Sequence, residues 1–89
     1  SDRRSAIARK VDHAKDILDG DFAAPPTLEA LARRVGLNVR YLTDGFRARH
    51  GMTVTRYVAE RRLVLAAELL DAGASVGQAA GAVGYSTPH

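Results

Sequence analysis

The sequence contains no cysteine and no tryptophan, and aromatic residues make up only 6% of its 89 residues. The absence of cysteine excludes disulfide bonds and thiolate zinc sites, and it fits a reducing compartment. No apolar run approaches the ~18 residues that span a bilayer, and the first residues lack the apolar region of a secretory signal. We therefore expect a cytoplasmic chain without membrane contact, whose thin core consists mainly of leucine, valine and alanine.

Residue patterns that carry catalysis or bind metals are also missing. His13, His50 and His89 lie far apart in the sequence, and no zinc-protease, P-loop or dinucleotide motif is present. The acidic residues between positions 16 and 21 lack the alternating ligands and the distal glutamate of a calcium loop. The sequence thus predicts no enzyme, no metal site and no cofactor, and His50 is expected to be a surface residue at a helix end.

The middle of the chain is typical of two short helices joined by a tight turn. We expect helices over 27–35 and 38–49, with Thr27 and Asn38 as N-caps and Gly36 in the turn. Apolar residues at helical spacing should form the buried side: Leu28, Leu31, Ala32, Val35, Leu37, Leu42 and Phe46. A small residue at the helix crossing, a glycine four positions later and a polar second helix predict a helix-turn-helix motif.

The same spacing recurs further along the chain, at a fixed offset of 48 positions. The first set is Leu28, Leu31, Ala32, Val35, Gly36 and Leu37, and the second set is Val76, Ala79, Ala80, Val83, Gly84 and Tyr85. Six matched positions at one offset are stronger evidence than either motif alone. We therefore expect a second helix-turn-helix motif, with Ala32 and Ala80 tightly buried where the helices cross.

Two further helices are expected around the first motif. A lead helix over 3–19 should end at Gly20, with Phe22 packing it against the first motif. A linking helix over 53–71 is apolar on more than one side, which suits a helix that serves two small cores. At ~1.5 Å per residue it spans ~28 Å, close to the ~34 Å between successive major-groove faces on one side of B-DNA.

The second motif begins in the last part of the chain. Ser75 and Gln78 form a capping box for a helix over 76–83, and Thr87 can cap a further helix with Pro88 at its first position. These six helical segments predict an all-α, homeodomain-like fold of two helix-turn-helix subdomains joined by a long helix, the second subdomain being incomplete. The expected boundaries are 1–52 for the lead helix and first subdomain, 53–71 for the linking helix, and 72–89 for the start of the second subdomain.

Positive charge is concentrated in one segment. Residues 33–62 contain eight arginines against Asp44 and Glu60, a net charge of +6, whereas the whole chain carries +3. The segments before and after carry −1 and −2. Such a concentration indicates a polyanionic partner, because clustered arginine and lysine are typical of surfaces that bind nucleic acid.

Several short stretches carry a resemblance to a known family. They are Leu28-Glu-Ala-Leu-Ala, Val35-Gly-Leu, Tyr41-Leu-Thr, Phe46-Arg, His50-Gly-Met-Thr, Arg62-Leu-Val-Leu-Ala-Ala-Glu-Leu-Leu and Ala82-Val-Gly-Tyr-Ser. Over residues 11–89 the chain resembles the DNA-binding region of the arabinose-regulator (AraC/XylS) family of bacterial transcription regulators. The resemblance implies double-stranded DNA as a partner, RNA polymerase as a second candidate partner, and an effector or dimerisation domain outside this chain.

The expected recognition residues lie on one edge of the helix over 38–49. Arg40, Thr43, Asp44 and Arg47 follow the helical spacing i, i+3, i+4 and i+7. The resemblance implies that the first three face base edges and that the fourth lies near phosphates; arginine can bind guanine O6 and N7 with both ends of its guanidinium. The predicted DNA-binding residues are Asn38, Arg40, Thr43, Asp44, Arg47, Arg49, Ser86, Pro88 and His89.

Two residues depart from the family pattern, and each leaves an alternative open. Asp44 stands where the family often has arginine, and it can accept a hydrogen bond from cytosine or pair with Arg40 or Arg47. Gly45 replaces a residue that is usually apolar and packs inward, which puts the rigidity of the recognition helix in doubt. Asp44 and the incomplete second motif leave open the alternative of a helical protein-interaction domain without DNA binding. Arg62 is expected either to brace the two subdomains or to contact phosphate.

Overall fold

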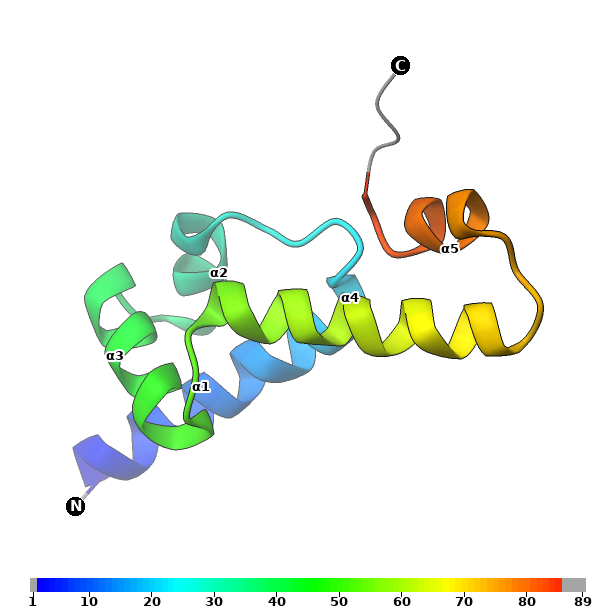
Figure 1. Cartoon of the computed structure of the whole chain (residues 1–89). Helices are drawn as coiled ribbons and strands as arrows, with labels where there is room; N and C mark the ends of the chain where they lie inside the picture. The colour runs from blue at the N-terminus through cyan, green and yellow to red at the C-terminus, as the bar shows by residue number, and fades with distance from the viewer. Residues whose placement is uncertain (1, 86–89) are drawn as a thin grey trace.

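The structure is a computed structural model that describes residues 2–85. These residues form five helices and no strand (Figure 1). The helices are α1 (Asp2–Asp21), α2 (Leu28–Val35), α3 (Val39–His50), α4 (Val54–Asp71) and α5 (Val76–Ala82). The all-α fold class is confirmed, and the sixth helix expected from Thr87 lies outside the described residues.

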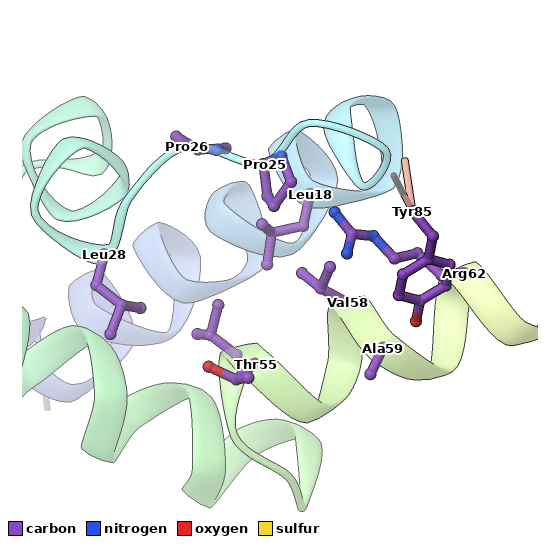
Figure 2. Close-up of a pocket in the computed structure, with 10 residues that line it drawn as sticks. Leu18, Pro25, Pro26, Leu28, Thr55, Val58, Ala59, Arg62 and Tyr85 are labelled. Carbon is purple, nitrogen blue, oxygen red and sulfur yellow. The ribbon is translucent and has the colours of Figure 1, made fainter. Parts of the chain in front are cut away.

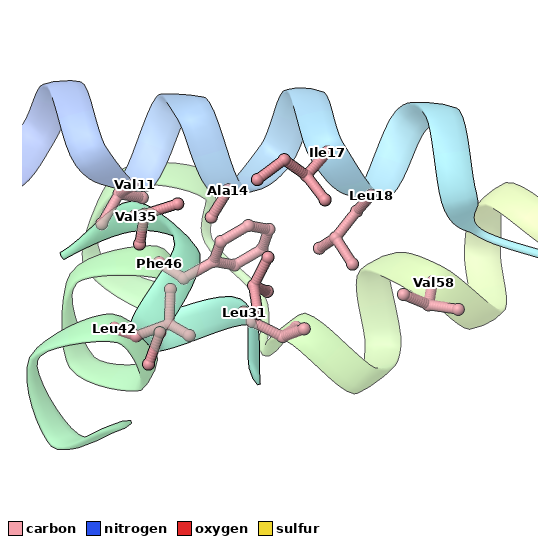
Figure 3. Close-up of a cluster of buried hydrophobic side chains, with 11 residues drawn as sticks. Val11, Ala14, Ile17, Leu18, Leu31, Val35, Leu42, Phe46 and Val58 are labelled. Atoms are coloured by element: carbon pink, nitrogen blue, oxygen red, sulfur yellow. The ribbon is translucent and has the colours of Figure 1, made fainter. Parts of the chain in front are cut away.

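The first three helices and the start of α4 share one apolar core (Figure 3). Its buried members are Val11, Ala14, Ile17, Leu18, Leu31, Ala32, Val35, Leu42, Phe46, Val54 and Val58. Phe46 is fully buried, and its ring meets that of Tyr57 edge-on at a centroid distance of 5.6 Å. The core is thus small and mostly aliphatic, as the composition predicts, with one aromatic ring buried in it.

Four of the expected helix starts are confirmed by a side-chain cap. Thr27, Asn38, Thr53 and Ser75 each accept a hydrogen bond from the backbone N–H three residues further on. Ser75 and Gln78 form the full capping box. These contacts satisfy backbone N–H groups that have no partner inside the helix, which is why the boundaries could be predicted locally.

The lead helix is longer than its sequence predicts, because it continues through Gly20 to Asp21. Asp19 accepts a hydrogen bond from the Tyr57 hydroxyl of α4, and Asp21 lies 3.7 Å from the Arg34 guanidinium of α2. These partners hold the last turn and offset the ~1 kcal/mol by which glycine disfavours a helix interior. The prediction that Gly20 ends the helix is therefore wrong.

The turns of the two motifs repeat at the level of individual hydrogen bonds. Leu37 N donates to Ala32 O at 2.9 Å, and Tyr85 N donates to Ala80 O at 2.9 Å. Gly36 and Gly84 both adopt positive φ, at 77° and 93°. The 48-residue offset thus relates two copies of the same helix end.

The second motif is packed less tightly than the first. Ala32 is 2% exposed, as expected, but Ala80 is only half-buried, and Ala79 and Val83 take the buried positions at 3% and 0%. The reason is that α5 packs on α4, so only one side of this short helix is covered. The prediction of tight burial therefore holds for Ala32 and is wrong for Ala80.

The linking helix α4 is unbroken, and its buried residues belong to the first core. Val54 and Val58 belong to the first core, whereas Ala79 and Val83 are buried outside that cluster, at the end where α5 packs on α4. Leu63, at 62% exposure, is among the apolar residues of α4 that remain open to solvent. The expectation of a long helix at this place is confirmed, whereas a second core served by it stays a prediction, because no residue of α4 is buried outside the first core. No described helix has the length and apolar character needed to cross a bilayer.

Candidate nucleic-acid interface

The outer edge of α3 carries the polar side chains that the sequence places there. Leu42 and Phe46 bury the inner side of the helix, while the side chains of Arg40 and Asp44 are 90% and 76% exposed. Arg47 is also exposed. Packing on one side thus leaves a charged edge on the second helix of the motif, accessible to a large partner.

Arg40 and Asp44 face one another across one turn of α3. Their Nε and Oδ2 atoms are 3.8 Å apart. An exposed pair of this kind contributes only ~0.3–0.5 kcal/mol, so its main effect is on the position of the guanidinium. Of the pairings considered for Asp44, the structure shows the one with Arg40.

Two smaller polar residues flank this edge and use part of their hydrogen-bonding capacity within the helix. The Asn38 Oδ1 accepts from Tyr41 N at 2.7 Å, which leaves the amide NH2 group as a donor. The Thr43 hydroxyl donates to Arg40 O at 3.1 Å, which leaves its oxygen able to accept and its methyl group able to make apolar contacts.

Arg49 lies on the other side of α3. At 100° per residue, nine positions from Arg40 place it about opposite that residue. Its Nε and Nη2 atoms donate to the two carboxylate oxygens of Asp12 at 2.6 and 2.8 Å, and this hydrogen bonding lowers the pKa of Asp12. Arg49 therefore connects α3 to the lead helix and does not lie on the polar edge with Arg40. Its predicted contact with DNA stays a prediction.

His50 is not the surface residue that its place at a helix end suggested. Its side chain is 17% exposed, and its ring lies 4.8 Å from that of Phe46. Its Nε2 atom is 3.5 Å from Asp12 Oδ1. The end of α3 is thus fixed to the core and to α1, and this part of the expectation is wrong because α1 covers the histidine.

The other arginines of the basic segment mostly have partners inside the domain. Arg34 lies near Asp21, Arg56 near Glu60 and Arg61 near Asp19, at 3.7, 3.2 and 3.6 Å. Within residues 2–85, Arg33 and Arg47 make no ion pair or side-chain hydrogen bond, so their positive charge is uncompensated at short range. Arg33, exposed in the last turn of α2, is a phosphate-contact candidate that the sequence did not single out.

Gly45 has a structural reason that the sequence did not reveal. A Cβ atom at this position would lie 2.9 Å from Val11 Cγ2 and 3.3 Å from Ile7 Cγ2 of α1. Val11 is fully buried, so it has little room to move away. The absence of a side chain therefore lets α1 approach α3 closely. Gly45 thus lies at a close crossing of two helices, which answers the doubt about the rigidity of α3.

We expect Gly45→Ala to destabilise the domain even though alanine favours helix. Overpacking costs ~1–3 kcal/mol, which exceeds the ~1 kcal/mol gained in helix propensity. Urea unfolding followed by circular dichroism measures the difference. The matched variant is Gly45→Ala combined with Val11→Ala, which removes the methyl group that the new Cβ would meet. If Gly45→Ala stabilises the protein in both backgrounds, the helix crossing is not tight.

Ser86, Pro88 and His89 lie outside the described residues. Within residues 2–85 no group of three or more histidine, cysteine, aspartate or glutamate side chains could hold a metal ion. A groove of about 420 Å³ lies between the end of α1, the α1–α2 connector and α4, and is bounded by Tyr85 (Figure 2).

Comparisons with known proteins agree with this geometry. A family model described as "Helix-turn-helix domain" matches residues 31–89, more than half of the chain. The chain is also similar to Regulatory protein PchR of Pseudomonas aeruginosa, with 46% identity over 54 residues. That match covers 61% of this chain but only 18% of the relative. No solved structure gives a significant match.

Proposed function

Because the chain belongs to the arabinose-regulator (AraC/XylS) family of helix-turn-helix DNA-binding domains, we propose that it binds double-stranded DNA sequence-specifically, with α3 in the major groove. The observation that carries the proposal is the edge of α3. Arg40 and Asp44 are exposed there, and Arg47 has no ion-pairing partner within residues 2–85. The core fixes the opposite side of the helix, so the edge is presented in a defined orientation.

Each residue of the edge has a role that follows from its chemistry. Arg40 reads guanine O6 and N7, and Thr43 contacts a base edge or a thymine methyl group. Asp44 holds Arg40 in place and favours cytosine N4 over other groups near it. Asn38 donates from its amide to a base or phosphate, and Arg47 contacts phosphate.

The proposed role of the whole protein is supported by the similarity to PchR. PchR is a regulatory protein, and the matched segment is a small part of it. We infer that the longer protein regulates transcription, with an effector or dimerisation domain beyond the region described here. Chromosomal DNA as the ligand implies a cytoplasmic location in a bacterium, and RNA polymerase is the corresponding second partner.

Salt dependence tests whether the domain binds DNA at all. Duplexes enriched from a random pool, together with a scrambled duplex, are titrated by fluorescence anisotropy at several salt concentrations. Neutralised phosphates release counterions, so the affinity should fall linearly on a log–log plot with a slope of about −0.9 per phosphate contact. Binding without salt dependence, or no binding, would favour the helical protein-interaction domain instead.

Asp44→Ala should tighten binding to scrambled DNA and narrow the gap between the enriched and the scrambled duplex. The carboxylate is repelled by phosphates on both walls of the groove, and its loss also frees Arg40 from its paired position. The same titrations at two salt concentrations measure both effects. Glu68→Ala, which removes an exposed carboxylate from α4, is the control. Weaker binding to both duplexes would mean that Asp44 stabilises α3 and reads no base.

A further inference from the structure

The turn of the second motif lies directly against the connector between α1 and α2. Gly84 has φ +93°, and a Cβ atom built on it would overlap the carbonyl oxygen of Ala23. Two independent constraints therefore require glycine here, since a side chain would be strained by the backbone angle and would also collide with the connector. The corresponding Gly36 of the first motif has only the flexible end of Lys10 near it.

The guanidinium group of Arg62 contacts both the connector and the turn of the second motif. Arg62 of α4 donates from Nε to Phe22 O at 2.8 Å and from Nη2 to Ala23 O at 3.2 Å. The same group lies 5.1 Å from the centroid of the Tyr85 ring, and Figure 2 shows the two side chains side by side at the end of the groove. A planar guanidinium can donate along its edge and stack through its face, which an ammonium group cannot do.

This attachment matters because α5 is weakly held elsewhere. It has seven residues, and two of them, Gly77 and Gly81, each cost ~1 kcal/mol relative to alanine in a helix interior. Its buried contact with α4 rests on Ala79 and Val83. A short helix packed on one side of another can tilt or rotate on it, whereas a second attachment away from the first removes that freedom.

We propose that Arg62, Gly84 and Tyr85, here called the clamp, fix the orientation of the second helix-turn-helix motif relative to the first. The linking helix sets the distance between the motifs, and the clamp sets their angle. Under the proposed function, on which this step rests, the clamp determines which pairs of major-groove segments the two motifs can contact together. Arg62 is thus a positioning residue, which decides between the two roles expected for it.

The orientation can be measured without DNA. The chain has no cysteine, so cysteines at the exposed positions Ala48 of α3 and Ala82 of α5 can carry two spin labels. Pulsed electron-spin resonance should give a narrow distance distribution in the otherwise unchanged chain and a broadened, shifted one with Arg62→Met or Gly84→Ala. Arg62→Lys should not restore the narrow distribution. Arg56→Met is the control, because Arg56 is exposed and pairs with Glu60 within α4.

Amide hydrogen exchange of α2 and α3 shows whether a variant has simply unfolded. Protection there should be unchanged in the Arg62 variants, and if it is lost, Tyr85→Leu, which removes only the ring contact, takes their place. A distribution as narrow as that of the control would overturn the clamp. This outcome is independent of DNA, so it is distinguishable from failure of the proposed function, which appears as a lack of salt-dependent binding.

Footprinting on an enriched duplex tests the DNA consequence. A longer form of the protein that carries the whole second helix-turn-helix motif should protect two neighbouring groove segments. Arg62→Met in that form should lose protection of one segment while keeping the Arg40-dependent one. Protection of both segments by the Arg62→Met form, or of only one by the form without the substitution, would overturn the role of the clamp in pairing the two contacts.

Discussion

Phe46→Ala is expected to lower the free energy of unfolding by about 3–5 kcal/mol. The ring is fully buried and contacts the rings of both His50 and Tyr57, so its loss leaves a cavity where α1, α3 and α4 meet. Domains of this size have a total stability of roughly 5–15 kcal/mol. The variant should therefore lose a large part of the stability of the domain and unfold at a clearly lower temperature.

Thermal and urea unfolding, followed by far-ultraviolet circular dichroism, measure this loss. Phe22→Ala is the matched control, because Phe22 is the other phenylalanine of the chain and is only partly buried. Its substitution should cost clearly less. Equal losses for the two variants would show that the core around Phe46 can collapse to fill the space, contrary to the packing described above.

Arg40→Ala is expected to weaken binding to the enriched duplex by ~1–3 kcal/mol, or roughly 5- to 150-fold, and to relax specificity. Arg47→Ala should instead weaken binding to all sequences alike and reduce the salt slope by about one phosphate contact. The two residues lie on the same edge of α3, yet a base contact and a phosphate contact respond differently to sequence and to salt.

Anisotropy titrations with enriched, single-base-changed and scrambled duplexes separate these effects. Arg56→Ala serves as the control, since it removes an exposed arginine from a different helix. The assignment of Arg40 to bases would be wrong if both α3 variants changed affinity by the same factor on every duplex.

The features predicted correctly from the sequence are those set by nearby residues. Thr27, Asn38, Thr53 and Ser75 cap their helices through contacts three positions away, so a local pattern is sufficient to place them. The repeated turn could likewise be found by its spacing. The exposed edge of α3 followed from the positions of Leu42 and Phe46 on the opposite side, because helical periodicity fixes both sides at once.

The features that were not predicted depend on partners far away in the sequence. Asp12 binds Arg49 across 37 positions and holds His50 nearby, and Asp19 binds Tyr57 across 38 positions. No local pattern identifies such pairs. Family likeness was also misleading at Gly45, since the residue type made sense only once α1 was seen to lie against it.

The close crossing at Gly45 has a mechanical consequence for the recognition helix. A side chain at a helix crossing can change rotamer and absorb a small displacement, but Gly45 has none, so Val11 of α1 meets the backbone of α3. Sliding or rotation of α1 would therefore displace α3 directly. A force on the first turns of α1 would reach α3 along this contact, without passing through the turn at Gly36.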